Sequence, residues 1–253
     1  MDHVDPRAAA REAAEAMPIG DIDPSHPALY RDDSWEPYFA RLRRDDPVHW
    51  TPGGMYGAYW SVTKYRDIMA VDTDHRTFSS DAMMGGIVLR DVPMDFRRPS
   101  FISMDPPKHD AQRKVVAPIV APANLANMSG TLRERVRRIL DGLPRGEAFD
   151  WVDRVSVELT TQMLATLFDF PFEDRRRLTY WSNVATVNTR AGTEIDTEAK
   201  RDAVLQGAAD YFAELWRERA KQPPKYDLIS MLAHGEATRD LPDRPAEFMG
   251  TLL

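Results

Sequence analysis

Apolar residues recur at every third or fourth position through most of the chain beyond Asp105. This spacing places them on one face of an α-helix, whereas a half-buried strand would alternate at every second position. Such a pattern over so long a stretch predicts a mainly α-helical fold. The expected helices carry their apolar faces at Leu125, Met128, Leu132, Val136, Ile139 and Leu143; at Leu178, Trp181, Val184 and Val187; and at Val204, Ala208, Tyr211, Leu215 and Trp216.

The N-terminal part of the sequence follows a different pattern. Residues 48–51 and 59–62 are β-rich runs, and the Pro and Gly residues between them favour a turn, so the two runs predict a β-hairpin. Residues 1–32 are expected to form an N-terminal extension, in which a short Ala-rich helix ends before a series of prolines. We therefore expect one mainly α domain over residues 33–253, with a small N-terminal β-sheet.

Composition excludes several classes of site and partner. The chain contains no cysteine, so these residues supply no disulfide, no cysteine nucleophile and no thiolate ligand to a metal or heme. Its 33 Lys and Arg against 40 Asp and Glu give a net charge of −7, which argues against nucleic acid as a partner. No apolar run approaches the roughly 20 residues of a membrane span, and the N-terminus lacks the pattern of a signal peptide. A cytoplasmic protein is therefore expected.

The best local candidate for a binding site is the pair His109 and Arg113. They lie four residues apart on a helix that Asp105-Pro106-Pro107 is expected to open, with Asp105 as its cap and the two prolines in its first turn. The two side chains should therefore share one face. Both side chains donate hydrogen bonds, and together they could hold an anion such as a carboxylate. Spacing alone favours the alternative, an ordinary helix surface whose cations bind their own carboxylates.

Other charged residues are interpreted as structural. The arginines between 133 and 138 are expected on the solvated face of an amphipathic helix. Glu158 lies on an apolar helix that is expected to be deeply buried, and its carboxylate is expected to be paired or exposed at the helix end. Residues 79–103 show no regular period, and so long an irregular segment is either functional or a mobile surface loop.

The run Phe101–Arg113 closely resembles the start of the C helix in bacterial cytochrome P450 enzymes, whose pattern is Met-Asp-Pro-Pro-x-His-x-x-x-Arg. Finer features at residues 159–171 and 181–186 resemble one branch of that family, the soluble terminal hydroxylases of alkanes and fatty acids. The resemblance covers about residues 33–253. Further stretches similar to the family occur in the same order, at residues 47–50, 59–62, 77–80, 149–153 and 227–232.

The resemblance implies roles for particular residues. In the family, the residues that match His109 and Arg113 hydrogen-bond the propionates of heme b. Residues 82–102 would form the loop between the B and C helices, which lines the substrate pocket, and residues 184 and 187 would lie on the F helix in the pocket roof. The residues expected to contact an apolar substrate are Ile87, Val88, Leu89, Phe101, Ile102, Val184 and Val187.

The resemblance also implies what these residues lack. The sequence stops where the long I helix of the family should begin, so the acid–alcohol pair, the Glu-x-x-Arg motif and the cysteine loop are missing. No catalytic residue or metal ligand is therefore assigned. The expected fold class is an incomplete cytochrome P450 fold, from about helix A to helix H. We expect a P450 monooxygenase as the full-length protein, and we expect this chain alone to be inactive.

The expected function is that of the N-terminal portion of a heme-thiolate monooxygenase that hydroxylates an apolar substrate, at the terminal carbon of an alkane or fatty acid. Electrons would come from NAD(P)H through a ferredoxin reductase and a ferredoxin. Two alternatives stay open: a non-catalytic truncated helical module, and a P450 that acts on a terpene or steroid. An open reading frame beyond codon 253 that encodes a cysteine-containing heme loop would separate the enzyme from the non-catalytic module.

Overall fold

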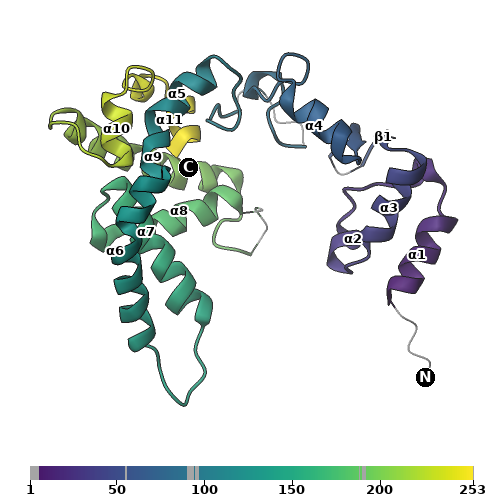
Figure 1. Ribbon diagram of the computed structural model, residues 1–253, viewed down its shortest axis with the longest axis horizontal. Helices are drawn as coiled ribbons and strands as arrows, with labels where there is room; N and C mark the ends of the chain where they lie inside the picture. The colour runs from purple at the N-terminus through teal and green to yellow at the C-terminus, as the bar shows by residue number, and fades with distance from the viewer. Residues whose placement is uncertain are drawn as a thin grey trace. The chain divides into compact units, whose positions relative to one another are not determined.

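The structure is a computed structural model that describes residues 6–54, 56–89, 94, 97–187, 189 and 192–252. The chain divides into two compact units, Met1–Arg97 and Arg98–Leu253. The first unit contains α1 (Pro6–Ala16), α2 (Pro27–Arg31), α3 (Trp35–Asp45), β1 (Val48–Thr51), β2 (Tyr59–Val62) and α4 (Tyr65–Thr73) (Figure 1). The second contains α5 (Lys108–Val116), α6 (Pro122–Asp141), α7 (Glu158–Phe168), α8 (Arg176–Thr186), α9 (Glu198–Ala220), α10 (Leu228–His234) and α11 (Pro245–Leu252).

The N-terminal helix α1 packs against α3 within the first unit (Figure 1). Ala14 and Ile22 are buried together with Tyr38 and Leu42 of α3, and these four side chains form a small apolar core. The Arg41 guanidinium donates hydrogen bonds to two backbone carbonyls at the C-terminal end of α1, where helix carbonyls lack partners of their own. The N-terminal extension is therefore held to α3 by apolar burial and by a helix-end contact.

The predicted hairpin is confirmed, with β1 and β2 antiparallel and Trp50 opposite Trp60. The two indole rings are exposed, and their centroids lie 4.9 Å apart. His49 is buried, its Nδ1 lies 2.7 Å from Asp46 Oδ2, and its Nε2 lies 2.8 Å from the backbone oxygen of Ile22. A buried histidine thus joins the hairpin to the N-terminal core.

The core of the second unit is built around α9, against which α8, α10 and α11 pack (Figure 1). Phe212 of α9 is 2% exposed, and its ring contacts the rings of Phe168, Phe170 and Trp181. The helices predicted from the apolar spacing are confirmed in α6, α8 and α9. The other buried residues of this core are Ala165, Leu178, Ala208, Ala209, Leu215, Trp216, Ile229, Leu232, Ala233, Leu241 and Phe248.

Two helices are less buried than their apolar residues suggest. Within α7 the buried residues are Thr161 and Ala165, and a π-helical segment at Val152–Val157 precedes it. The prediction of a deeply buried helix here is wrong, because the neighbours α6, α8 and α10 cover α7 on part of its circumference. The apolar residues of α6 are likewise half-buried or exposed.

Within the described ranges, no single helix is long and apolar enough to cross a membrane. One bent pair of segments, Lys108–Val120 and Pro122–Asp141, is long and apolar enough when the two are joined, by length and composition alone. The two segments meet at a bend of 42°.

We expect Phe212→Ala to lower the free energy of unfolding by about 3–5 kcal/mol, because it leaves a cavity among three aromatic rings. Urea denaturation followed by tryptophan fluorescence measures this loss. Leu140→Ala is the matched control on α6, where the side chain is 44% exposed, and it should cost less than about 1 kcal/mol. Equal losses in the two variants would contradict the core assigned to α9.

Candidate functional site

The helix that carries the candidate pair, α5, begins at Lys108. The prediction that Asp105 caps this helix and that the two prolines form its first turn is therefore wrong. A residue that precedes a proline disfavours the helical conformation, and both Asp105 and Pro106 are in that position. The backbone carbonyl of Asp105 accepts a hydrogen bond from the His109 N–H at 3.1 Å, so the segment still leads directly into the helix.

His109 and Arg113 lie one turn apart on α5, as their spacing predicts. His109 Nδ1 is 2.8 Å from Asp110 Oδ1, and the imidazole is 27% exposed. Arg113 is exposed, and in the part of the chain that the structure describes its guanidinium makes no hydrogen bond or ion pair. Because a protonated imidazole donates from both nitrogens, His109 can bind Asp110 through Nδ1 and a second anion through Nε2. The pair therefore offers two donors suited to a carboxylate.

The predicted substrate residues belong to both units. Ile87, Val88 and Leu89 lie in the first unit and are about half exposed, at 54%, 55% and 47%. In the second unit Phe101 packs against the α9 core, and Ile102 is 68% exposed.

The two predicted contacts on α8 differ in burial. Val184 is 3% exposed, and Val187 is half-buried just beyond the helix end. The side chain of Val184 is therefore covered by protein in this structure. Substrate contact by all seven residues stays a prediction.

A buried carboxylate beside α5 was missed by sequence reasoning. Glu247 of α11 is 5% exposed. Its Oε2 accepts hydrogen bonds from Lys108 Nζ at 2.6 Å and from Arg244 Nη1 at 2.7 Å, and its Oε1 accepts one from Gln112 Nε2 at 2.6 Å. Burial raises the pKa of the Glu247 carboxyl, but the hydrogen bonds from Lys108 and Gln112 outweigh it and leave the pKa below its usual value. The carboxylate is therefore ionised at neutral pH.

Glu158 is paired, as expected, at the start of α7. Its Oε1 lies 2.8 Å from Arg175 Nη2 and 2.7 Å from Gln162 Nε2, and its Oε2 lies 3.2 Å from Arg176 Nη2. Burial raises the pKa of the Glu158 carboxyl, but the hydrogen bonds from Gln162 and Arg175 and the Arg175 charge reverse the effect, so the pKa is lowered. These contacts join α7 to α8 and leave Glu158 no role as a proton donor at neutral pH.

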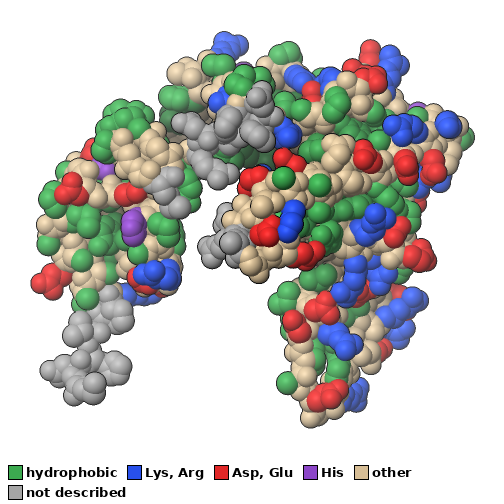
Figure 2. Space-filling view, turned by 180° about the vertical axis from the view of Figure 1, so that it is seen from behind, with side chains coloured by type: hydrophobic (Ala, Val, Ile, Leu, Met, Phe, Trp, Pro, Cys, Tyr) green, Lys and Arg blue, Asp and Glu red, His purple; other side chains and the backbone are tan. Residues whose placement is uncertain are grey.

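The arginine cluster of α6 is largely a solvated face. Arg137 and Arg138 both bind Glu134 on the exposed side of the helix, and Figure 2 shows cationic and acidic side chains mixed over the arm that α6 forms. Arg135 departs from this expectation. Its guanidinium donates to the Gln162 backbone oxygen at 2.5 Å and therefore packs α6 against α7.

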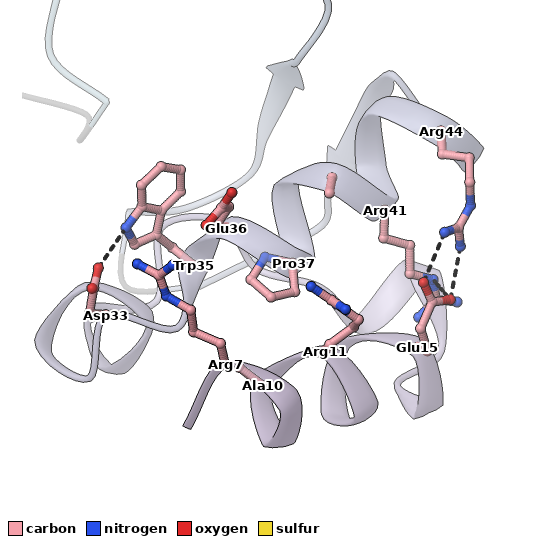
Figure 3. Close-up of a pocket in the computed structure, with 11 residues that line it drawn as sticks. Arg7, Ala10, Arg11, Glu15, Asp33, Trp35, Glu36, Pro37, Arg41 and Arg44 are labelled. Carbon is pink, nitrogen blue, oxygen red and sulfur yellow. Dashed lines mark hydrogen bonds and ion pairs between the residues drawn. The ribbon is translucent and has the colours of Figure 1, made fainter. Parts of the chain in front are cut away.

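Two grooves are lined by residues that are not among the predicted site residues. One of about 390 Å³ lies between α1 and α3 in the first unit, and Arg11 projects toward α3 across it (Figure 3). Arg44 binds Glu15 there through hydrogen bonds of 2.9 and 2.8 Å, so part of the charge is neutralised. The other, of about 330 Å³, lies between α9 and α11 in the second unit. None of the seven predicted substrate residues lines either groove.

Several known proteins that are similar to the chain are named monooxygenases. No protein-family model matches the chain. Linalool 8-monooxygenase of Pseudomonas putida is 29% identical over 243 residues, which are 91% of this chain and 58% of that protein. Steroid C26-monooxygenase of Mycobacterium tuberculosis is 30% identical over 234 residues, which are 87% of this chain and 52% of that protein. The chain thus spans slightly more than half the length of these curated relatives.

Solved structures agree with this partial coverage. Cytochrome P450-153 from Novosphingobium aromaticivorans matches 91% of the chain with a TM-score of 0.78 and 41% sequence identity. CYP153D17 from a Sphingomonas species matches the same share with a TM-score of 0.77 and 43% identity. In both cases the chain covers 57% of the solved chain. The incomplete fold that the sequence resemblance implied is confirmed.

We expect Glu158→Gln to lower the free energy of unfolding at pH 7 by about 1–3 kcal/mol, because two guanidinium groups lose a charged acceptor. The folded-state pKa of Glu158 lies below 4.5, so its contribution is present above pH 4.5 and is lost as the pH falls through the folded-state value. The difference between variant and parent should therefore shrink on acidification. Urea denaturation at pH 7 and near pH 4 measures it.

The matched control for this prediction is Glu134→Gln, which removes two exposed ion pairs. Exposed pairs contribute about 0–1 kcal/mol, so this variant should change stability little at pH 7. A Glu158→Gln loss that is as large near pH 4 as at pH 7 would contradict the charged contacts assigned here.

Proposed function

The chain belongs to the cytochrome P450 superfamily and carries an incomplete fold of that family, and we propose that it is the N-terminal portion of a heme-thiolate monooxygenase. The whole enzyme would insert one oxygen atom into a C–H bond of an apolar substrate. Monooxygenase names among the relatives support the reaction class. The single structural observation that carries the proposal is the pair of available donors on one face of α5.

The residues present fit the acidic part of a heme. A heme b carries two propionate carboxylates, and Arg113 and protonated His109 are the type of donor that binds carboxylates. Arg113 has no competing partner among the described residues, and His109 keeps one ring nitrogen free of Asp110. We therefore assign both side chains to the propionates. The bound heme would supply oxygen activation, which is the chemistry of the cofactor rather than of these residues.

The chain supplies no axial thiolate, because its sequence contains no cysteine. In the proposed enzyme that ligand comes from residues outside these 253, and this chain alone is inactive. Residues 33–253 would then be the N-terminal part of one P450 domain, with residues 1–32 as its extension. A non-catalytic module remains the alternative that the missing cysteine favours.

The proposed substrate is a linear hydrocarbon or fatty acid, hydroxylated at its terminal carbon. The proposed substrate contacts are the apolar side chains of Ile87, Val88, Leu89, Phe101, Ile102, Val184 and Val187, and apolar contacts favour an apolar substrate class. The names of the two curated relatives favour a second candidate, a terpene or a steroid.

The proposed electron supply is a ferredoxin together with its NAD(P)H-dependent reductase. A monooxygenase needs two electrons for each oxygen inserted, and these two proteins would supply them. The cytoplasm, where NAD(P)H is available, is the proposed compartment.

We expect His109→Ala combined with Arg113→Ala to weaken hemin binding by roughly a hundredfold to ten-thousandfold, because charge-assisted hydrogen bonds contribute about 1.5–3 kcal/mol each and the double variant removes two of them. Titration of the purified chain with hemin, followed at the Soret band, measures the affinity. Lys114→Ala is the matched control, since Lys114 is an exposed cation on the same helix. Unchanged affinity in the double variant would refute the propionate assignment.

The substrate proposal is tested in the protein that joins these residues to a cysteine-containing heme segment. We expect linear alkanes and fatty acids to shift the absorption spectrum of that protein more than linalool or a steroid does. The spectral dissociation constants measure this preference. A response to the terpene or the steroid with none to any linear compound would instead support the second candidate.

A further inference from the structure

The buried Glu247 carboxylate is not used by the proposed function, yet it is bound to the helix that carries the candidate site. Lys108 and Gln112 of α5 both donate to it at 2.6 Å, and Arg244, the residue before α11, donates at 2.7 Å. A buried carboxylate that loses one of its partners is left with an uncompensated charge, which is strongly unfavourable. The three donors therefore hold α11 and α5 in one arrangement.

The contact to α5 fixes the rotation of that helix about its axis. Each residue advances about 100° around an α-helix, so the stripe formed by Lys108 and Gln112 is displaced by about 100° from the stripe formed by His109 and Arg113. Lys108 immediately precedes His109, and Gln112 immediately precedes Arg113. Holding the first stripe against Glu247 consequently sets the direction in which the second stripe points.

The same helix, α11, also packs against the segment that leads to two predicted substrate contacts. Gly250 lies three residues after Glu247, and a Cβ atom at that position would clash with the backbone oxygen of Pro99. The segment itself is closed by hydrogen bonds, since Ser103 N donates to the Ser100 carbonyl at 3.0 Å and Ser100 N donates to Ser103 Oγ at 2.9 Å. Phe101 lies within this turn.

We propose that Glu247 is a positioning residue for the propionate-binding face of α5. It acts through Lys108 and Gln112, and it does not itself touch the heme. This role rests on the proposed function, because that function assigns the heme propionates as the ligand of His109 and Arg113. Gly250 also packs closely on Pro99. Helix α11 therefore supports both the helix of the propionate site and the turn that carries Phe101.

The test uses the full chain with Glu247→Gln, which keeps the shape of the side chain and removes its charge. Hydrogen exchange, measured by mass spectrometry without hemin, reports the local opening of residues 108–116. We expect exchange in this peptide to become about tenfold faster, since charge-assisted hydrogen bonds are replaced by neutral ones. Titration with hemin should show a loss of affinity of about tenfold, with a shifted Soret band.

Two further variants keep the test decisive. Lys108→Met removes a half-exposed partner without entering the core, and it should give a smaller change in the same direction. Glu134→Gln removes an exposed, ion-paired glutamate of α6 and should change neither measurement. Circular dichroism confirms that each variant retains its helices.

The possible outcomes separate this inference from the proposed function. Faster exchange together with weaker hemin binding supports the positioning role. Unchanged exchange at residues 108–116 in both Glu247→Gln and Lys108→Met overturns it, as does faster exchange with parental hemin affinity. If the double variant at His109 and Arg113 binds hemin like the parent, the proposed function fails instead, and exchange alone then decides whether Glu247 orders α5.

Discussion

A carboxylate that has left water must be matched by donors, and in the second unit this requirement falls on Glu247. Its three donors come from both ends of the unit's sequence, with Lys108 and Gln112 separated from it by 139 and 135 residues. Apolar packing around α9 brings the helices together without specifying their rotation, because the hydrophobic effect is not directional. Hydrogen bonds to a buried charge are directional, so they select one rotation of α5 among those that packing would allow.

Local patterns predicted those elements whose burial repeats with the period of the backbone. The apolar spacing at Leu178, Trp181 and Val184 corresponds to the buried face of α8, and the Pro and Gly residues after Thr51 lead to the antiparallel register of β1 and β2. The same reasoning was wrong for the burial of α7, because apolar composition does not report how many neighbours a helix has. It was also wrong for the start of α5, where the effect of a proline on its preceding residue outweighs a favourable cap sequence.

The candidate site likewise contains residues that the sequence predicted and one residue that it did not. His109 and Arg113 could be found because a spacing of four is a local signal and because the surrounding run resembles a known family. Glu247 had no such signal within its own segment. A charged residue in an apolar stretch indicates a buried partner, but the sequence does not say which of many cations supplies it. The only local sign in the sequence was the spacing of Lys108 and Gln112, which lie four residues apart beside the candidate pair. This spacing indicates that α5 has a second face that can bind other parts of the protein.

The two faces of α5 therefore perform separable tasks. The face with Lys108 and Gln112 is bound to protein and sets the helix orientation. On the other face His109 Nδ1 binds Asp110, while His109 Nε2 and the Arg113 guanidinium have no partner among the described residues. A preorganised donor binds its ligand more tightly than a mobile one, because the entropy cost of ordering the donor arises in folding rather than in binding. Under the proposed function, the contribution of this part of the protein would be to orient the acidic groups of the heme and to contact the apolar substrate.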